Sequence, residues 1–532
     1  MRQQRNVTHS LDELRREIAA VFSSLMKINV KDLNLNKADS MEYEQNKKYL
    51  RQALRTCCYG DLAAKDYVKE YMKDLLQNQF GINERNIQQL ISFSESTSLS
   101  AIDKFDILLH CYKREYGFLG LERFLIDNGL FVGKMNEHGI RYEVTALDIE
   151  RIYHAHEDVV KNMEYGDHLS IVTQRIYQFY RGHGVIDEIR DMKIDGVSGG
   201  VSGLDAYESV WIFFQGKTIH LSFLSFGTQQ ELERVCKNIY RYGSPGQLSA
   251  AKGYIANEMA DGSRVIVVRP PFAESWAFFV RKFDSIKKAN VEELITDQNN
   301  EIVIDTMKWL IKGCQVVGIT GSQGSGKTTL LMSLVQYINE SYTLRIQELT
   351  FELNLRKLYP NRNILSFRET ANVSGQEGLD LQKKTDGSVN ILGEVATAPV
   401  AAWLIQIAQV ASIFTIFTHH AKTTKDLVIA LRNALLNAGG FSNEHVAEEQ
   451  VVDTIRFDIH MNRDVYGHRY IERITEIIPE PSGERMFCTR DIVVWRDGKY
   501  YMENPISIDV AEEMKKYLGI EERRAFESFN QI

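Results

Sequence analysis

The chain has 532 residues, of which 44% are hydrophobic and 25% charged, and its formal net charge is −8. This length is too great for a single core, and the composition excludes a disordered or fibrous protein. The net charge excludes a globally basic face for nucleic acid or anionic lipid, although it leaves room for a local basic patch. The six cysteines are scattered without a C-x-x-C pair, which indicates incidental thiols in a reducing cytosol.

Residues 1–130 predict a helical N-terminal region. Ser10 and Glu13 have the spacing of a capping box, and an amphipathic stripe follows in steps of three and four residues. The members of this stripe are Leu11, Leu14, Ile18, Val21 and Leu25. The segments 65–76 and 102–116 have similar patterns. The region is either a small helical bundle that packs on itself or an arm that docks a partner. Its polar start predicts no secretory leader.

Residues 145–283 predict a mixed α+β domain. We expect helices over 147–162 and 171–181, and strands over 210–214, 218–226 and 264–268. Four glycines predict a turn-rich loop between the helices and the strands: Gly196, Gly199, Gly200 and Gly203. No G-x-G-x-x-G motif follows a strand here, so no dinucleotide site is predicted.

A polar stretch over 284–300 predicts a linker, and one further domain is expected over 301–532. Strand and helix patterns alternate over about 301–478. This alternation predicts an α/β fold with a mostly parallel sheet. The uncharged segment 398–418 is long enough to span a membrane. Its glutamines and its β-branched second half favour a helix followed by a central strand instead. Short strands over 491–495 and 499–502 and a helix over 510–518 are expected to close the chain.

A phosphate loop of the G-x-x-x-x-G-K-T type lies between an apolar strand pattern and a helix pattern. Its residues, with the one that follows, are Gly321, Ser322, Gln323, Gly324, Ser325, Gly326, Lys327, Thr328 and Thr329. The glycines let backbone N–H groups turn toward a polyphosphate, and the helix N-terminus adds partial positive charge. Lys327 is expected to reach the β- and γ-phosphates of ATP, and the Thr328 hydroxyl to hold Mg²⁺.

Acidic residues and a histidine pair follow other predicted strands. Glu394 ends the apolar stretch 388–393, so we expect it across from the phosphate loop, in the network of Mg²⁺ and water. Glu348 and Glu352, four residues apart, supply two further carboxylates. His420, next to His419, follows another central strand and could sense the γ-phosphate. A zinc site at the two histidines lacks a third ligand at a convincing spacing.

Taken in order, these four blocks resemble the Walker A, Asp box, Walker B and His box of the type II/type IV secretion ATPase superfamily. The resemblance is closest to the branch that powers tight-adherence (Flp-type) pili, followed by the type IV secretion traffic ATPases. Residues 261–271 resemble the DGSR…PP motif of that branch, and 280–283 resemble its IRKF strand end. Residues 352–355 resemble its E-L-x-L, 368–370 its R-x-E-T region, and 469–477 the shared C-terminal strand. The likeness covers about 170–505.

This resemblance implies a P-loop NTPase (RecA-like) C-terminal domain after a mixed α+β domain over 145–283. It implies a cytoplasmic ATPase that forms a ring, a hexamer by this resemblance, with ATP and Mg²⁺ bound between the two domains. Arg264 and Arg281 would reach the nucleotide from the N-terminal side, with Arg269 a further candidate. The partner would be an inner-membrane platform protein of a pilus or secretion system, reached by peripheral association only. No direct nucleic-acid contact is expected.

The chain departs from the family pattern at three places. Leu349 stands where the family has Asp in the Asp box, Ala396 stands where it favours Arg, and the glycine-rich turn before the His box is absent. Each departure could slow hydrolysis. Three functions therefore remain open: an ATP-driven motor for pilus assembly or secretion, a conjugation or effector-export traffic ATPase, and a nucleotide-binding scaffold with little hydrolysis.

Overall fold

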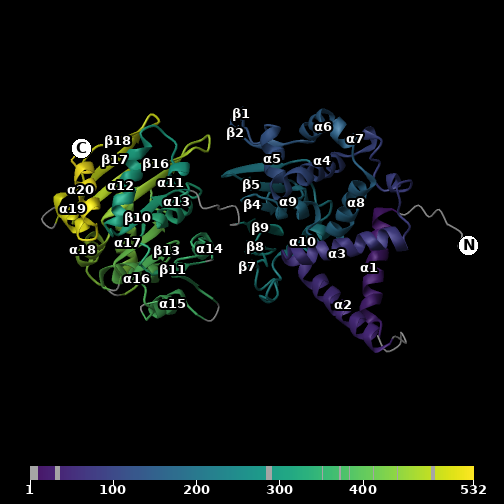
Figure 1. The fold of residues 1–532 in the computed structure, drawn as a ribbon, viewed down its shortest axis with the longest axis horizontal. Helices are drawn as coiled ribbons and strands as arrows, with labels where there is room; N and C mark the ends of the chain where they lie inside the picture. The colour runs from purple at the N-terminus through teal and green to yellow at the C-terminus, as the bar shows by residue number, and fades with distance from the viewer. Residues whose placement is uncertain are drawn as a thin grey trace, which may run out of the picture. The chain divides into compact units, whose positions relative to one another are not determined.

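The computed structural model describes residues 10–29, 36–282, 290–349, 351–370, 373–382, 384–410, 412–439, 441–480 and 486–531. The chain divides into two compact units, Met1–Ser285 and Ile286–Ile532. Figure 1 shows the helices and strands of each unit. The stretch predicted as a linker, 284–300, lies partly outside the described residues. Its described part contains the short helix α11 (Val291–Leu294) and the start of α12 (Asn300–Lys312).

The first unit begins with helices. Ser10 and Glu13 form the capping box, each side chain accepting the backbone N–H of the other residue. Leu14, Ile18 and Phe22 of the first helix are buried in the core of the unit. The helices are α1 (Leu11–Lys27), α2 (Lys37–Thr56), α3 (Leu62–Asp74), α4 (Ala101–Tyr116), α5 (Gly120–Asp127), α6 (Ala146–Ala155), α7 (Glu157–Lys161), α8 (Tyr165–Tyr180), α9 (Asp187–Asp191) and α10 (Gln229–Ile239), with the 3₁₀ turn η2 (Cys57–Tyr59) after α2.

The same unit contains a sheet of order β3-β6-β5-β4-β9-β8-β7 among its described residues. Its strands are β3 (Glu143–Val144), β4 (Gly196–Gly199), β5 (Val210–Phe214), β6 (Lys217–Leu221), β7 (Tyr254–Glu258), β8 (Arg264–Val268) and β9 (Ala277–Arg281). A separate hairpin pairs β1 (Lys134–Asn136) with β2 (Gly139–Arg141).

The predicted turn-rich loop is wrong at Gly196–Gly199, because these residues form the buried central strand β4. A Cβ atom on Gly196 would lie 2.3 Å from the carbonyl oxygen of Val280 in the neighbouring strand. A Cβ atom on Gly199 would lie 2.7 Å from the Phe278 ring. The glycines therefore allow a close approach of strand and side chain rather than a turn.

The second unit is an α/β domain around one large sheet of order β12-β11-β13-β14-β10-β15-β16-β17-β18 among the described residues. The strands from β12 to β15 in this order are parallel, and the rest are antiparallel. The strands are β10 (Val317–Gly321), β11 (Leu344–Glu348), β12 (Ile364–Arg368), β13 (Val389–Leu392), β14 (Phe414–His419), β15 (Phe457–Arg463), β16 (Arg469–Pro479), β17 (Phe487–Arg496) and β18 (Lys499–Met502).

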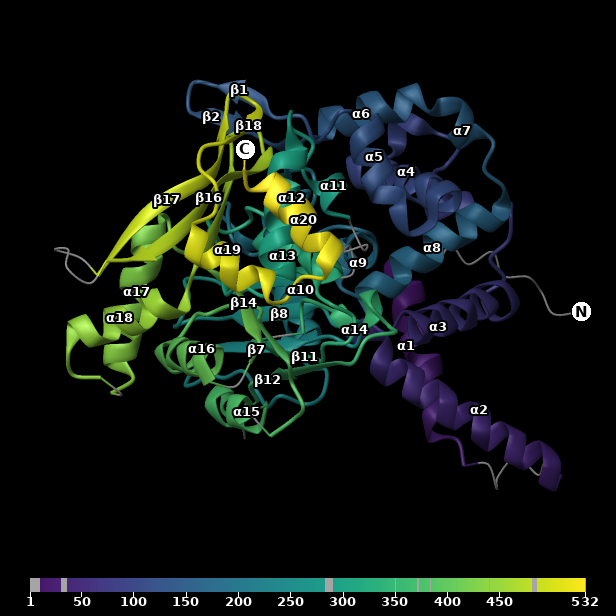
Figure 2. The ribbon, with the colours of Figure 1, turned by 60° about the vertical axis from the view of Figure 1, so that its left-hand side comes forward.

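Helices cover both faces of this sheet. One core contains side chains of α12, α13 (Lys327–Leu334), α19 (Ile508–Lys515) and α20 (Ile520–Phe529). The helices α19 and α20 lie in front of the sheet in Figure 2. A second core contains side chains of α16 (Ala398–Val410), α17 (Thr424–Asn437) and α18 (Glu444–Thr454). The short helices α14 (Leu355–Leu358) and α15 (Gly375–Gln382) lie in the connections of β11, β12 and β13. The predicted α/β fold with a mostly parallel sheet is confirmed.

The uncharged segment 398–418 forms α16 and most of β14, as its two-part composition predicts. Within the described ranges, no helix has both the length and the apolar character needed to cross a bilayer.

Candidate nucleotide-binding site

The phosphate loop connects the buried strand β10 to the N-terminus of α13. Gly321, Gly324 and Gly326 have φ angles of +136°, +78° and +100°, which side-chain-bearing residues rarely adopt. A Cβ atom on Gly321 would also lie 2.1 Å from the Met461 carbonyl oxygen. The loop therefore needs glycine at these positions, and its backbone forms a cradle at a helix N-terminus, where anions bind.

Lys327 begins α13 and is buried within the loop. Its Nζ donates to the carbonyl oxygens of Gly321 (2.9 Å) and Ser322 (2.8 Å). Burial lowers the pKa of Lys327 to about 8, although the charge of Glu394 opposes this shift. The negative charge of a bound phosphate would stabilise the protonated form of the buried lysine. Two hydroxyls lie in the same loop: Ser325 Oγ is buried without a hydrogen-bond partner among the described residues, and Thr328 is half-buried.

A line of polar groups runs from Lys327 to Glu394. His420 Nδ1 lies 3.4 Å from Lys327 Nζ, and His420 Nε2 lies 3.2 Å from Glu394 Oε1. Both Glu394 and His420 stand at the carboxyl ends of their strands, β13 and β14. The Val395 N–H donates to the Thr418 carbonyl (3.0 Å), which ties these two strand ends together. The parallel sheet thus brings together the lysine, histidine and glutamate that the sequence predicted separately.

His419 lies beside this line rather than in it. Its Nδ1 accepts the Ala421 N–H at 3.0 Å, and burial lowers its pKa to about 4. The side chain is therefore neutral near pH 7, with its proton on Nε2. Among the described residues no group of three or more His, Cys, Asp or Glu side chains is placed to hold a metal ion.

Glu348, at the end of β11, does not point toward the loop. Its Oε1 accepts the backbone N–H groups of Glu352 and Leu353, both at 2.8 Å, while Oε2 is buried without a hydrogen-bond partner in the described parts of the chain. A Cβ atom on Gly393 would lie 3.3 Å from Glu348 Cγ, so the glycine before Glu394 leaves room for this side chain. Burial raises the pKa of Glu348 to about 7.

Because the pKa of Glu348 is raised, we expect the effect of Glu348→Gln on stability to depend on pH. The folded protein keeps a proton on Glu348 that the unfolded chain loses at about pH 4.5, so this residue reduces stability as pH rises from 4.5 to 7. Glutamine keeps the acceptor oxygen without the charge. The variant should therefore gain up to about 3 kcal/mol relative to the parent between pH 5 and pH 8. Denaturant unfolding at both pH values measures this, and a pH-independent difference would contradict it.

A polar network below the loop was not predicted from the sequence. Thr320 Oγ1 donates to Asp458 Oδ1 (2.6 Å) and lies 2.7 Å from His460 Nδ1, and Thr424 Oγ1 donates to Asp458 Oδ2 (2.7 Å). Asp458 is fully buried, and burial raises the pKa of its carboxyl group. These contacts fix the residue before Gly321 and the start of α17. The available signal was an Asp and a His that alternate with the apolar residues Phe457, Ile459 and Met461 in β15.

Two arginines of the β15–β16 hairpin lie over the loop and were also missed as site residues. Arg463 and Arg469 are cross-strand partners. Arg463 Nη1 lies 3.4 Å from where a Cβ atom on Gly324 would be, and Arg469 Cδ lies 3.5 Å from the corresponding position on Gly326. Arg463 is half-buried and has no ion pair within the part of the chain that the structure describes. Its guanidinium is free to contact a phosphate on the cradle.

Arg264 and Arg281 belong to the first unit, where they are direct cross-strand partners on β8 and β9. Direct partners in an antiparallel pair project from the same face of the sheet. Arg281 is exposed and its guanidinium lies 5.7 Å from the centre of the Phe213 ring. Asp261 and Ser263, in the turn before β8, are held locally: Asp261 pairs with Arg190 at 2.8 Å and also accepts the Ser263 N–H.

The fold and the loop together define a P-loop domain. The cradle, the buried lysine and the partnerless Ser325 hydroxyl fit a polyphosphate, and Thr328 fits a Mg²⁺ ion that takes its other ligands from phosphates and water. The strand order is that of the RecA-like class predicted from the sequence: β10 lies between β14 and β15, and β13, which leads to Glu394, is one strand removed.

Comparison with solved structures finds similarity to several secretion and pilus proteins. The VirB11 ATPase of the Brucella suis type IV secretion system, in complex with sulphate, is 17% identical over 53% of this chain and 88% of that one, with a TM-score of 0.30. The Legionella pneumophila ATPase DotB is 14% identical over 64% and 85%, with a TM-score of 0.38. The pilus retraction motor PilT with bound ADP is 13% identical over 65% and 89%, with a TM-score of 0.39. No family model and no curated protein matches the chain.

Proposed function

We propose that the chain is a Mg²⁺-dependent ATPase whose hydrolysis drives pilus assembly or protein secretion. The observation that carries this proposal is the line from Lys327 through His420 to Glu394, beside a glycine cradle. Lys327 and Arg463 would bind the phosphates, and Thr328 would hold Mg²⁺, which withdraws charge from the phosphates when bound. Glu394, half-buried beside His420, would orient the attacking water and accept its proton.

The motor would act as a homo-oligomeric ring, a hexamer by the resemblance in its motifs. It would work in the cytoplasm, associate peripherally with the inner face of the cell membrane, and pass movement to an inner-membrane platform protein. Phosphate release by the purified protein, fractionated by size and measured with and without Mg²⁺, tests the activity and the assembly together. Mg²⁺-dependent turnover in a large fraction is the expected result, and turnover only in the monomer fraction would contradict the ring.

Arg463→Ala tests the contribution of the hairpin to phosphate binding. Loss of one charge-assisted contact of about 1.5–3 kcal/mol should weaken ATP binding roughly 10- to 100-fold. Arg496→Ala is a matched control, because Arg496 lies on β17 of the same sheet in a surface ion pair with Glu503 (2.7 Å). Nucleotide titration of both variants makes the comparison. Equal affinities would exclude Arg463 from the site.

Arg281→Ala tests the role that the resemblance gives to the arginines of the first unit. We propose that Arg281, with Arg264, stabilises charge on the transferring phosphoryl group. Turnover should then fall by at least roughly tenfold, while the affinity for ATP changes little. Steady-state hydrolysis and equilibrium binding separate these two effects. A variant that keeps full turnover would remove Arg281 from the catalytic assignment.

A second candidate, a nucleotide-gated scaffold with little hydrolysis, is favoured by the orientation of Glu348. This carboxylate is held by the N–H groups of Glu352 and Leu353, and the next residue is Leu349 rather than an acid. Such a protein would assemble with ATP and fail to release phosphate. A traffic ATPase for conjugation or effector export would share the site and differ only in its cargo.

A further inference from the structure

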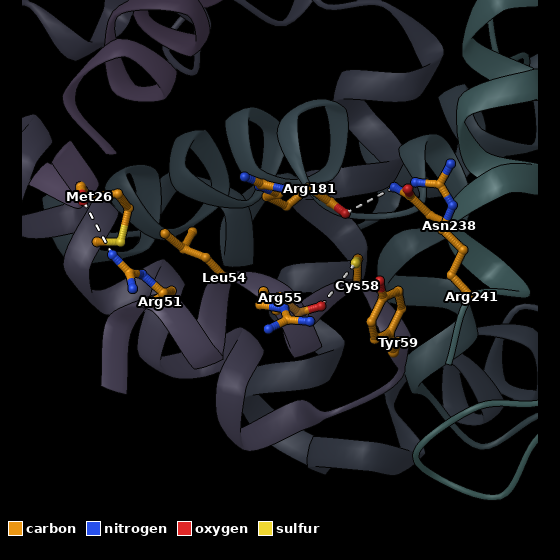
Figure 3. Close-up of a pocket in the computed structure, with 9 residues that line it drawn as sticks. All are labelled: Met26, Arg51, Leu54, Arg55, Cys58, Tyr59, Arg181, Asn238 and Arg241. Atoms are coloured by element: carbon orange, nitrogen blue, oxygen red, sulfur yellow. Dashed lines mark hydrogen bonds between the residues drawn. The ribbon is translucent and has the colours of Figure 1, made fainter. Parts of the chain in front are cut away.

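A pocket with an unusual concentration of arginine lies inside the first unit, away from the phosphate loop in the sequence. Its volume is about 250 Å³, and it is lined by Met26, Arg51, Leu54, Arg55, Cys58, Tyr59, Arg181, Asn238 and Arg241. These residues come from α1, α2, η2, the end of α8 and the end of α10. Figure 3 shows the arginines spread along the pocket, from Arg51 beside Met26 to Arg241 beside Asn238.

No acidic side chain lines this pocket among the residues that the structure describes. Among the described residues, none of Arg51, Arg55, Arg181 and Arg241 forms an ion pair. Arg51 donates only to the Met26 carbonyl (3.3 Å), and the buried Nε of Arg181 has no hydrogen-bond partner in the described ranges. Four guanidinium groups around one small cavity therefore present donors that no carboxylate accepts within the described ranges.

Three acids of the same unit pair with cations that do not line the pocket. Asp187 pairs with Lys65, Asp261 with Arg190, and Glu231 with Arg234. Arg55, Arg181 and Arg241 line the same pocket as Tyr59. The chain is acidic overall, so this local excess of positive charge is not a property of its composition.

We propose that this pocket binds a ligand carrying two or more phosphate groups. Guanidinium forks match phosphate oxygens, and their spread along the cavity fits several negative groups better than a single ion. Met26, Leu54 and Tyr59 supply an apolar wall for an organic portion of the ligand. Because the pocket is formed by the N-terminal helices and α10, a bound ligand would fix these helices against each other. This inference does not depend on the activity of the phosphate loop.

The test uses the full chain carrying Lys327→Ala, so that binding at the phosphate loop does not obscure the pocket. Inorganic tripolyphosphate is titrated by calorimetry, and sedimentation with vesicles containing cardiolipin, whose headgroup carries two phosphate groups, serves as the second arm. Arg55→Gln and Arg181→Gln, separately and together, are compared with Arg85→Gln. Arg85 is an exposed arginine of the same unit that does not line the pocket. Arg55 is exposed, and its side chain forms no hydrogen bond or ion pair within the described ranges, so its replacement should leave the fold intact.

Tripolyphosphate binding that weakens at least about tenfold in the double variant, and not in Arg85→Gln, supports a soluble phosphorylated ligand. Vesicle binding with the same dependence on Arg55 and Arg181, without tripolyphosphate binding, supports a lipid headgroup as the source of the phosphates. Binding that is equal in all variants, or absent in both arms, overturns the proposal. Binding of an acidic polyglutamate peptide alone, without either phosphate probe, overturns it as well.

Discussion

Replacing Lys327 with alanine is expected to abolish ATP binding while the second unit remains folded. The Lys327 ammonium is buried in the loop, and its partners are the backbone carbonyls of Gly321 and Ser322, with His420 Nδ1 at 3.4 Å. A charged group in such a place contributes most when an anion neutralises it, so its loss should cost at least about 100-fold in affinity. The strand and helix that frame the loop keep their apolar contacts, because only one side chain changes.

Lys357→Ala is the matched control, since Lys357 is an exposed lysine on α14 of the same unit. Equilibrium titration with ATP and thermal unfolding of both variants give affinity and fold integrity independently. An unchanged affinity in Lys327→Ala would remove the phosphate loop from the proposed function. A lower melting temperature with lost binding would show that the lysine also holds the loop closed through Gly321 and Ser322.

The phosphate loop could be predicted because its conformation is determined locally. Each glycine of the motif has a backbone angle or a close contact that only glycine tolerates, so residue type and spacing directly report geometry. Glu394 was predictable for a related reason. It ends an apolar strand, and strands of a parallel sheet present their carboxyl ends at one edge.

The neighbours of the site could not be predicted, because they depend on which strands pair. Asp458 and His460 contact Thr320 only because β15 lies beside β10, more than a hundred residues away in the chain. Arg463 reaches the loop through the same pairing. Glu348 is placed at the expected sheet edge, yet its carboxylate turns to two backbone N–H groups that a strand pattern does not reveal.

The glycines of β4 show the opposite limitation. Gly196 and Gly199 lie in a glycine-rich stretch, and the turn propensity of glycine alone favours a loop there. The packing of Val280 and Phe278 against the strand decides the outcome, because a larger residue would collide there. Propensity fails at this strand because tertiary packing outweighs it.

Glu394→Gln is expected to stop phosphate release while ATP still binds. The substitution keeps the size of the side chain and its ability to contact His420, which lies 3.2 Å from the carboxylate, and removes only the charge and the basic oxygen. Loss of a positioned general base costs typically 10²- to 10⁴-fold in rate. The phosphate contacts of the loop are unaffected, so affinity for ATP should remain within a few-fold of the parent.

Glu352→Gln tests the other half-buried carboxylate among the predicted site residues. Comparing it with Glu394→Gln shows which of the two glutamates is the base. If Glu394→Gln alone stops turnover, the base lies at the end of β13 and the motor function is supported. If only Glu352→Gln stops it, the base belongs to the loop after β11, and the line from Lys327 to Glu394 serves binding alone. If the parent protein binds ATP and assembles but releases no phosphate, the scaffold is the better description. The orientation of Glu348 and the absence of an acid at Leu349 then account for the missing chemistry.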